Sequence, residues 1–208
     1  MNNITTIAFD LGGVIITLDH KQALQRFGQL GLGETVQHLD PYRQNGIFGD
    51  IESGDISEQQ FVETLSQMAG RKITHKQCCH AWQGYVKELP QRNLRCLREL
   101  RSKGYRLVLL SNTNPFMMEW ALSTRFDGNG HSIEHYFDHL YLSYQMGMLK
   151  PDPGIFRQML IEEQTMPDRI LYVDDSPKNV SVASQMNMFT MCPENGADWT
   201  QEIFKHLI

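Results

Sequence analysis

Strand-prone runs alternate with amphipathic stretches along most of this chain. Such runs occupy residues 4–9, 105–110, 137–142, 170–173 and 188–191, and short apolar runs of this kind are typical of strands buried on both faces. Apolar residues at helical spacing predict helices over 91–102, 116–123, 153–163, 177–186 and 198–207. Strands and helices that alternate through short connections indicate an α/β fold with a parallel, doubly wound sheet.

The pattern changes between residues 18 and 88, where helix signals replace strand signals. Ser57 and Thr74 are each followed three positions later by a glutamine, as in a capping box at the start of a helix. Helical apolar spacing follows each of them. We therefore predict a helical cap over 18–88, inserted into a core formed by 1–17 and 89–208. A cap above the strand ends could exclude water from a site there.

Composition excludes several classes of function. The net charge is −5 and no basic stripe is present, so nucleic acid is not expected as a partner. No apolar stretch approaches the ~20 residues that span a bilayer, and the N-terminus has no signal-peptide pattern, so we expect a cytoplasmic protein without a membrane partner. The four cysteines show no zinc-site spacing. The oligomeric state stays open.

Polar residues directly follow three of the predicted strands. Burying a carboxylate at such a position is costly unless hydrogen-bond donors or a metal compensate the charge. The carboxyl ends of parallel strands meet at one edge of a sheet, where α/β enzymes place their sites. The residues concerned are Asp10 after the first strand, Ser111 and Asn112 after the second, and Asp174 and Asp175 after the fourth.

This combination of residue types suits phosphoryl transfer. A carboxylate nucleophile must stay ionised beside a phosphate dianion, so a divalent cation has to lie between them. Magnesium prefers oxygen ligands, commonly one or two carboxylates with waters and a substrate oxygen. The candidates are Asp10, Asp174 and Asp175 for the metal, Ser111 and the amide of Asn112 for the phosphate, and Lys150 to offset the crowded negative charge.

Four motifs in order give the chain a family resemblance: IAFDLGGVI, LLSNTN, GMLKPD and LYVDDSPKN, which together span residues 7–179. In these motifs the chain resembles the haloacid dehalogenase (HAD) superfamily hydrolases. The resemblance implies a Rossmann-like core with an inserted cap, a Mg²⁺ cofactor, and hydrolysis of a small phosphorylated metabolite. The first motif also resembles the DLG-type motif of bacterial α-glucose-1-phosphate phosphatases, which makes a sugar 1-phosphate one candidate substrate.

The same resemblance implies roles for individual residues. Asp10 corresponds to the nucleophile that forms a phosphoaspartyl intermediate. The Gly12 carbonyl and Asp175 correspond to metal ligands, and Asp174 to a ligand that binds directly or through water. Ser111 and Lys150 correspond to residues that hold the phosphoryl group, which makes Lys150 part of the catalytic set.

One position departs from the usual family pattern. Family phosphatases commonly carry a second aspartate two residues after the nucleophile as general acid and base, and here that residue is Gly12. Proton transfer of this kind contributes ~10²–10⁴-fold in rate. A good leaving group such as an anomeric sugar oxygen lessens the need for it. Alternatively, Asp19 or His20 could supply the proton from the start of the cap.

Two other functions stay open on the sequence alone. One is a metal-independent 2-haloacid dehalogenase, although such enzymes lack the acid pair placed here at Asp174 and Asp175. The other is a low-turnover module that binds phosphate ligands, since Gly12 replaces the usual acid. We also leave open whether Asn179 orients Lys150 or a metal carboxylate.

Overall fold

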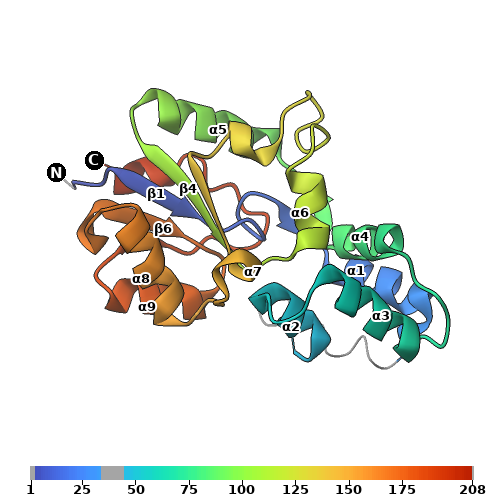
Figure 1. Ribbon diagram of the computed structural model, residues 1–208. Helices are drawn as coiled ribbons and strands as arrows, with labels where there is room; N and C mark the ends of the chain where they lie inside the picture. Colours follow the sequence, from blue (N-terminus) through green and yellow to red (C-terminus); the bar gives the residue numbers. More distant parts are fainter. Residues whose placement is uncertain (1–2, 34–44, 208) are drawn as a thin grey trace.

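The computed structural model describes residues 3–33 and 45–207, and its centre is a parallel sheet (Figure 1). The strand order is β5-β4-β1-β6-β7, and every neighbouring pair is parallel. This confirms the predicted Rossmann-like α/β core, with each strand found where the sequence placed it. The strands are β1 (Thr6–Phe9), β4 (Arg106–Ser111), β5 (His139–Leu142), β6 (Ile170–Val173) and β7 (Phe189–Met191).

Helices cover both faces of this sheet. Successive side chains of a strand point to opposite faces, so Ile7 and Phe9 pack on one side while Ala8 packs on the other. Figure 1 shows α5 on the first side and α8 and α9 on the second. These helices are α5 (Gln91–Ser102), α8 (Pro153–Glu162) and α9 (Pro177–Gln185), and α6 (Pro115–Ala121) follows β4.

A second hydrophobic cluster lies beyond the carboxyl ends of the strands, away from the two chain termini (Figure 1). Helices that contribute to it include α1 (His20–Phe27), α2 (Ile47–Ser53), α3 (Glu58–Met68) and α4 (His75–Trp82). Ser57 and Thr74 cap α3 and α4 with complete capping boxes, as predicted. The boundaries of a cap over 18–88 and a core over 1–17 and 89–208 stay a prediction.

Several short elements were not predicted. Strand β2 (Thr17–Leu18) pairs antiparallel with β3 (Val86–Glu88), within a region where the sequence suggested helices alone. Two or three residues are too few to show an alternating pattern, and the partner strand is far away in the chain. The helix α7 (Ser143–Met146) is equally short. Further short helical turns are η1 (Gly28–Leu32), η3 (Gln83–Tyr85), η4 (Ile133–His135) and η5 (Pro167–Arg169).

The helix predicted over 198–207 was wrong for most of its length. Only the turn η6 (Ile203–His206) is helical there. The Asp198 carboxylate accepts hydrogen bonds from the backbone N–H and the hydroxyl of Thr200, and such local bonds compete with helix formation. No helix among residues 3–33 and 45–207 is long and apolar enough to cross a membrane.

Candidate active site

Asp10 lies at the end of β1, where a tight loop begins. Its backbone N–H donates to the Val173 carbonyl at 2.8 Å, and its carboxylate accepts from the Leu11 N–H at 2.7 Å. Gly13 has a φ of +75°, and a Cβ at this position would lie 2.1 Å from an Asp175 carboxylate oxygen. Glycine is therefore required at position 13 both by the backbone conformation and by the approach of Asp175.

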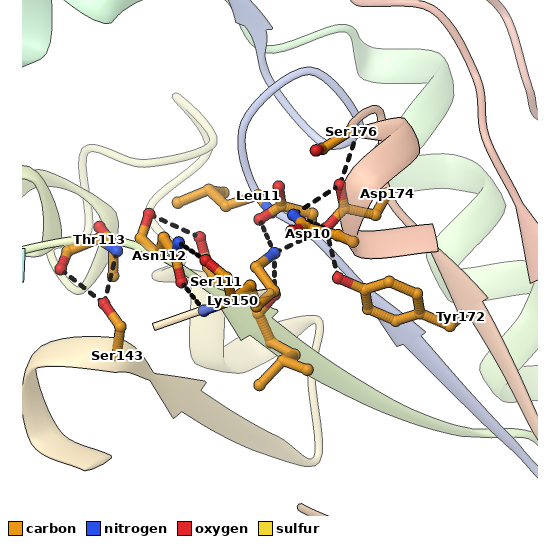
Figure 2. Close-up of polar contacts among 12 residues, drawn as sticks. Asp10, Leu11, Ser111, Asn112, Thr113, Ser143, Lys150, Tyr172, Asp174 and Ser176 are labelled. Carbon is orange, nitrogen blue, oxygen red and sulfur yellow. Dashed lines mark hydrogen bonds and ion pairs between the residues drawn. The ribbon is translucent and has the colours of Figure 1, made fainter. Parts of the chain in front are cut away.

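Lys150 connects the ends of three strands (Figure 2). Its Nζ lies 3.0 Å from Asp10 Oδ1 and donates to Asp174 Oδ2 and to the Leu110 carbonyl, each at 2.8 Å. An ammonium group has three donors, so these contacts use all of them. The burial that lowers the pKa of Lys150 is outweighed by Asp10 and Asp174, and the net effect raises it.

The Asp174 carboxylate is fully buried and hydrogen-bonded on both oxygens. Its Oδ1 accepts from the Ser176 N–H at 2.7 Å, and the Asn179 amide donates to Oδ1 at 3.2 Å and to Oδ2 at 3.0 Å. The Tyr172 hydroxyl also donates to Oδ2. Asn179 therefore orients a carboxylate of the acid pair, which was one of the two roles considered for it.

Three carboxylates converge at this edge of the sheet. Oxygens of Asp10, Asp174 and Asp175 all lie within 4.8 Å of one another. Burial raises the pKa of Asp10 to about 6, with a contribution from Asp174 that Lys150 opposes. Burial also raises the pKa of Asp175 to about 7, helped by the charges of Asp10 and Asp174.

The charge in this cluster is not balanced by the protein. Lys150 is the only cation among the described residues that line the cavity beside it, and it faces three carboxylates. An all-oxygen cluster with excess negative charge has the chemistry of a Mg²⁺-type site. Asp174 already accepts from four neighbours, whereas Asp175 and Asp10 have oxygens available, so the residues present fit a divalent cation.

Ser111 is the last residue of β4, and Asn112 follows it beside Lys150. Ser111 is 2% exposed and lines the cavity. The Asn112 side chain accepts from the Lys150 N–H at 2.8 Å and donates to the Lys150 carbonyl at 2.9 Å. The Asn112 side chain thus fixes the backbone of Lys150, a role that the sequence alone did not suggest.

A cavity of about 90 Å³ opens beside these groups. The residues that line it from the strand ends include Asp10, Gly12, Ser111, Asn112, Lys150 and Asp175. Glu52, Trp82 and Tyr85 line it from the helical side. The structure therefore brings together the predicted site residues and adds side chains from the second hydrophobic cluster.

Glu52 is a site residue that sequence reasoning missed. Its side chain is 9% exposed, and burial raises the pKa of Glu52 to about 8, an effect that a hydrogen bond with the Asn114 side chain opposes and the charge of Asp10 reinforces. Glu52 lies outside the four motifs, so the sequence pattern gave it no role.

Two proton donors suggested by the sequence lie elsewhere. Asp19 is the N-cap of α1, and its carboxylate accepts from the Gln22 N–H at 3.0 Å. Neither Asp19 nor His20 is among the described residues that line the cavity. Asp19 immediately precedes α1, and His20 is the first residue of that helix.

A second group of metal-ligand side chains joins α4 to α6. Cys79 Sγ lies 3.3 Å from Glu119 Oε2 and 3.5 Å from His75 Nδ1, and the three ligand atoms lie within 4.8 Å of one another. Sequence spacing gave no reason to pair these residues, since Glu119 comes from a distant helix. Burial raises the pKa of Cys79 to about 12, so the thiol is protonated at neutral pH.

The sequence and the fold match known proteins over nearly the full chain. D-ribitol-5-phosphate phosphatase from Bacteroides thetaiotaomicron is 42% identical over 200 residues, which cover 96% of this chain and 97% of that protein. The structure of a HAD-like family hydrolase from Porphyromonas gingivalis superposes with a TM-score of 0.93 at 38% identity, over 98% of each chain.

A third match was solved with ligands. It is a HAD family enzyme from Bacteroides thetaiotaomicron in complex with magnesium and inorganic phosphate, with a TM-score of 0.87 and 32% identity over 96% of this chain and 98% of that one. The profile of the haloacid dehalogenase-like hydrolases matches residues 4–187. The converging strand ends, the four motifs and these matches lead to one conclusion: the chain belongs to the haloacid dehalogenase-like hydrolase family.

Proposed function

We propose that the protein is a magnesium-dependent phosphatase that hydrolyses a small phosphomonoester through a phosphoaspartyl intermediate on Asp10. The observation that carries this proposal is the group of three carboxylates around Lys150, with oxygens within 4.8 Å of one another beside a small cavity. Magnesium in the structure of a relative of 32% identity supports the choice of metal.

The carboxylates have distinct proposed roles. One Asp10 oxygen attacks phosphorus, while the other, with the Gly12 carbonyl and the Asp175 carboxylate, would hold Mg²⁺. Asp174 would bind the ion directly or through water, and its hydrogen bonds with Ser176 and Asn179 favour the water-mediated form. When bound, Mg²⁺ supplies electrostatic stabilisation to the phosphoryl oxygens.

Lys150 and the end of β4 are proposed to hold the phosphoryl group. Ser111 has a buried hydroxyl at the cavity, and the Asn112 backbone N–H follows it. All three donors of Lys150 are engaged within the protein, so Lys150 contacts the phosphate by exchanging its bond with Asp10. That exchange also frees the Asp10 oxygen for attack or for the metal.

The proposed substrate class is a sugar or polyol phosphate. The relative of 42% identity is a phosphatase of D-ribitol 5-phosphate, an ester of a primary alcohol, whereas the first motif suggested a sugar 1-phosphate. The two classes differ in their leaving groups, since an alkoxide leaves less readily than an anomeric oxygen. The acid pair at Asp174 and Asp175 argues against the metal-independent dehalogenase alternative.

Phosphate release from a panel of esters tests this function. The panel contains D-ribitol 5-phosphate, a sugar 1-phosphate and p-nitrophenyl phosphate, assayed with Mg²⁺ and with a chelator, and chloride release from 2-chloropropionate is measured in parallel. We expect magnesium-dependent hydrolysis that Asp10→Asn abolishes. Chloride release that persists with the chelator, or ester hydrolysis that Asp10→Asn leaves unchanged, would exclude the proposal.

A further inference from the structure

The cavity is lined by one carboxyl group, that of Glu52, to which the proposed phosphoryl transfer gives no role. Position 12, where many relatives have an acid, is a glycine, and no other acid was assigned to the leaving group. Glu52 lines the same cavity as Asp10 and Lys150. It reaches this cavity from α2, on the side opposite the strand ends that hold Asp10 and Asp175.

The backbone around Glu52 is fixed against the core. The Ser143 hydroxyl, at the start of α7, donates to the Glu52 carbonyl at 2.7 Å. Gly54 has a φ of +79°, and a Cβ there would lie 2.3 Å from the Tyr144 carbonyl oxygen. Only glycine permits both this conformation and this approach, so the end of α2 docks closely on α7.

The Glu52 side chain is also held in place. Its carboxyl group interacts with the side chain of Asn114, whose side-chain oxygen accepts from the Met117 N–H at 3.1 Å and caps α6. Asn114 is buried and cannot turn away without leaving the helix end uncapped. The carboxyl group is therefore positioned from both its backbone and its side chain, as expected of a group with a precise task.

We propose that Glu52 is the general acid and general base of the reaction, and that it performs from the cap the task that Gly12 cannot perform. The inference rests on the proposed phosphatase function. It assigns to this chain a catalytic residue that comes from outside the four family motifs.

The surroundings of Glu52 keep it in the acid form. Burial raises the pKa of Glu52 to about 8, the Asn114 hydrogen bond lowers it in part, and the charge of Asp10 raises it further. The other ionisable groups around the cavity are Asp175, Lys150 and Tyr85, and Tyr144 lies on the helix packed against α2. A neutral carboxyl at pH 7 can donate a proton, which a carboxylate cannot.

The proposed steps balance. In the first step an Asp10 oxygen forms a bond to phosphorus, the bond between phosphorus and the ester oxygen breaks, and the leaving oxygen takes the proton of Glu52. The product is an alcohol, and Glu52 is left as a carboxylate. In the second step Glu52 takes a proton from the water that attacks phosphorus, the bond to Asp10 breaks, and inorganic phosphate and neutral Glu52 result.

The dependence on leaving group tests this assignment. Glu52→Gln keeps the size and the hydrogen-bonding capacity of the side chain but cannot donate an acidic proton. With Mg²⁺ present, we expect kcat/KM for D-ribitol 5-phosphate to fall by ~10²–10⁴-fold, because kcat/KM reports the first step and its alkoxide needs protonation there. The kcat/KM for p-nitrophenyl phosphate should change much less, since a nitrophenolate leaves unprotonated. The matched control is Glu63→Gln, on the exposed surface of α3, which should change neither rate.

A rescue experiment separates catalysis from a structural role. In Glu52→Gln combined with Gly12→Asp, an acid returns at the position where relatives have it. The backbone at Gly12 is outside the left-handed region, and a Cβ there meets only the end of the Leu18 side chain at 3.1 Å. We expect the double variant to regain turnover of D-ribitol 5-phosphate at least ~10-fold over Glu52→Gln alone, as general acid catalysis requires.

The outcomes are distinguishable. If the wild-type protein hydrolyses none of the esters, the proposed function fails and this inference fails with it. If the wild type is active and Glu52→Gln retains full activity toward the alkyl ester, the assignment of Glu52 alone is overturned. An equal loss of kcat/KM on both esters that Gly12→Asp does not rescue also overturns it, because such a loss indicates a structural role.

Discussion

The carboxylates at the ends of β1 and β6 contrast with that of Asp127, in the loop after α6. Asp127 is 4% exposed and thus buried like Asp174, whereas Asp10 and Asp175 are half-buried. Its oxygens accept from the N–H groups of Asn129 and His131 at 2.7 and 3.0 Å, from the His131 ring at 2.8 Å and from the Tyr136 hydroxyl at 2.7 Å. Burial raises the pKa of Asp127, but these hydrogen bonds outweigh it and hold the pKa well below the usual range.

The site cluster has the opposite balance. There, burial and mutual repulsion dominate, and the pKa values of Asp10 and Asp175 rise. Hydrogen-bond donors of the protein satisfy the Asp127 carboxylate, whereas at the strand ends a single ammonium group faces three carboxylates. The comparison shows two kinds of buried acid. The charge of Asp127, which has a structural role, is compensated by donors of the protein. The charge of the site carboxylates is only partly compensated by the protein, so a bound ligand has to balance the rest.

The largest expected effect comes from removing the attacking group. Asp10→Asn should lower kcat by at least ~10³-fold, since loss of a nucleophile commonly costs far more than that. Its melting temperature without metal should not fall, because one repulsive charge has left the cluster. Steady-state kinetics and thermal unfolding monitored by circular dichroism measure both quantities. A large loss of stability would place Asp10 with the structural acids instead.

The second-largest effect is expected from removal of the metal, which should change the behaviour of the site cluster but not that of Asp127. A chelator should reduce ester hydrolysis to background, and Mg²⁺ at 100 times its Kd should add about 2.7 kcal/mol of stability. Asp127→Asn should respond to Mg²⁺ as the wild type does, while Asp175→Asn should show little response. Thermal unfolding at several Mg²⁺ concentrations tests this. An unchanged response in Asp175→Asn contradicts its role as a ligand.

Asp127→Asn should show the converse behaviour. The amide puts a donor where the carboxylate accepts from Tyr136 or His131, and an unsatisfied buried group costs ~1–3 kcal/mol. For a chain of this size we expect the melting temperature to fall by about 2–4 °C per kcal/mol. Turnover by the folded enzyme at 25 °C should be unchanged. Reduced turnover with unchanged stability would erase the contrast between the two regions.

The smallest expected effect is a difference in pH dependence. The folded-state pKa values of Asp10 and Asp175 are raised, so these groups destabilise the metal-free protein as pH rises from about 4 toward 7. The folded-state pKa of Asp127 is depressed, so its contribution is present above about pH 4 and is lost as pH falls below that. Metal-free unfolding in urea should therefore show higher stability at pH 5 than at pH 7.5, and Asp175→Asn should flatten this slope.

The core of the site could be predicted because its residues follow strands directly. Asp10, Ser111 and Asp174 lie at or directly after the ends of parallel strands. A parallel sheet brings these strand ends together regardless of the loop conformations. Lys150 was found through its motif, but its contacts were not. The Asn112 side chain holds the backbone of Lys150, and all three donors of the Lys150 ammonium are engaged. Both facts depend on loop conformations that local sequence does not encode.

The helical side of the cavity could not be predicted in the same way. Glu52 reaches the cavity because the end of α2 docks on α7, and this contact joins residues that are about ninety positions apart in the chain. Helical periodicity shows which face of α2 is buried but not which distant element it meets. The same limit explains why His75 and Cys79 gave no sign of their contact with Glu119.

The β2–β3 ribbon has a mechanical consequence. The chain leaves the sheet region at Thr17 and Leu18 and returns at Val86 to Glu88, and hydrogen bonds tie the outgoing and returning segments side by side. The helices between these segments also contact the core where the end of α2 docks on α7. A rotation about the paired strands that separated α2 from α7 would therefore also move Glu52 away from Asp10, and the two carboxyl groups would face one cavity only in the closed arrangement seen here.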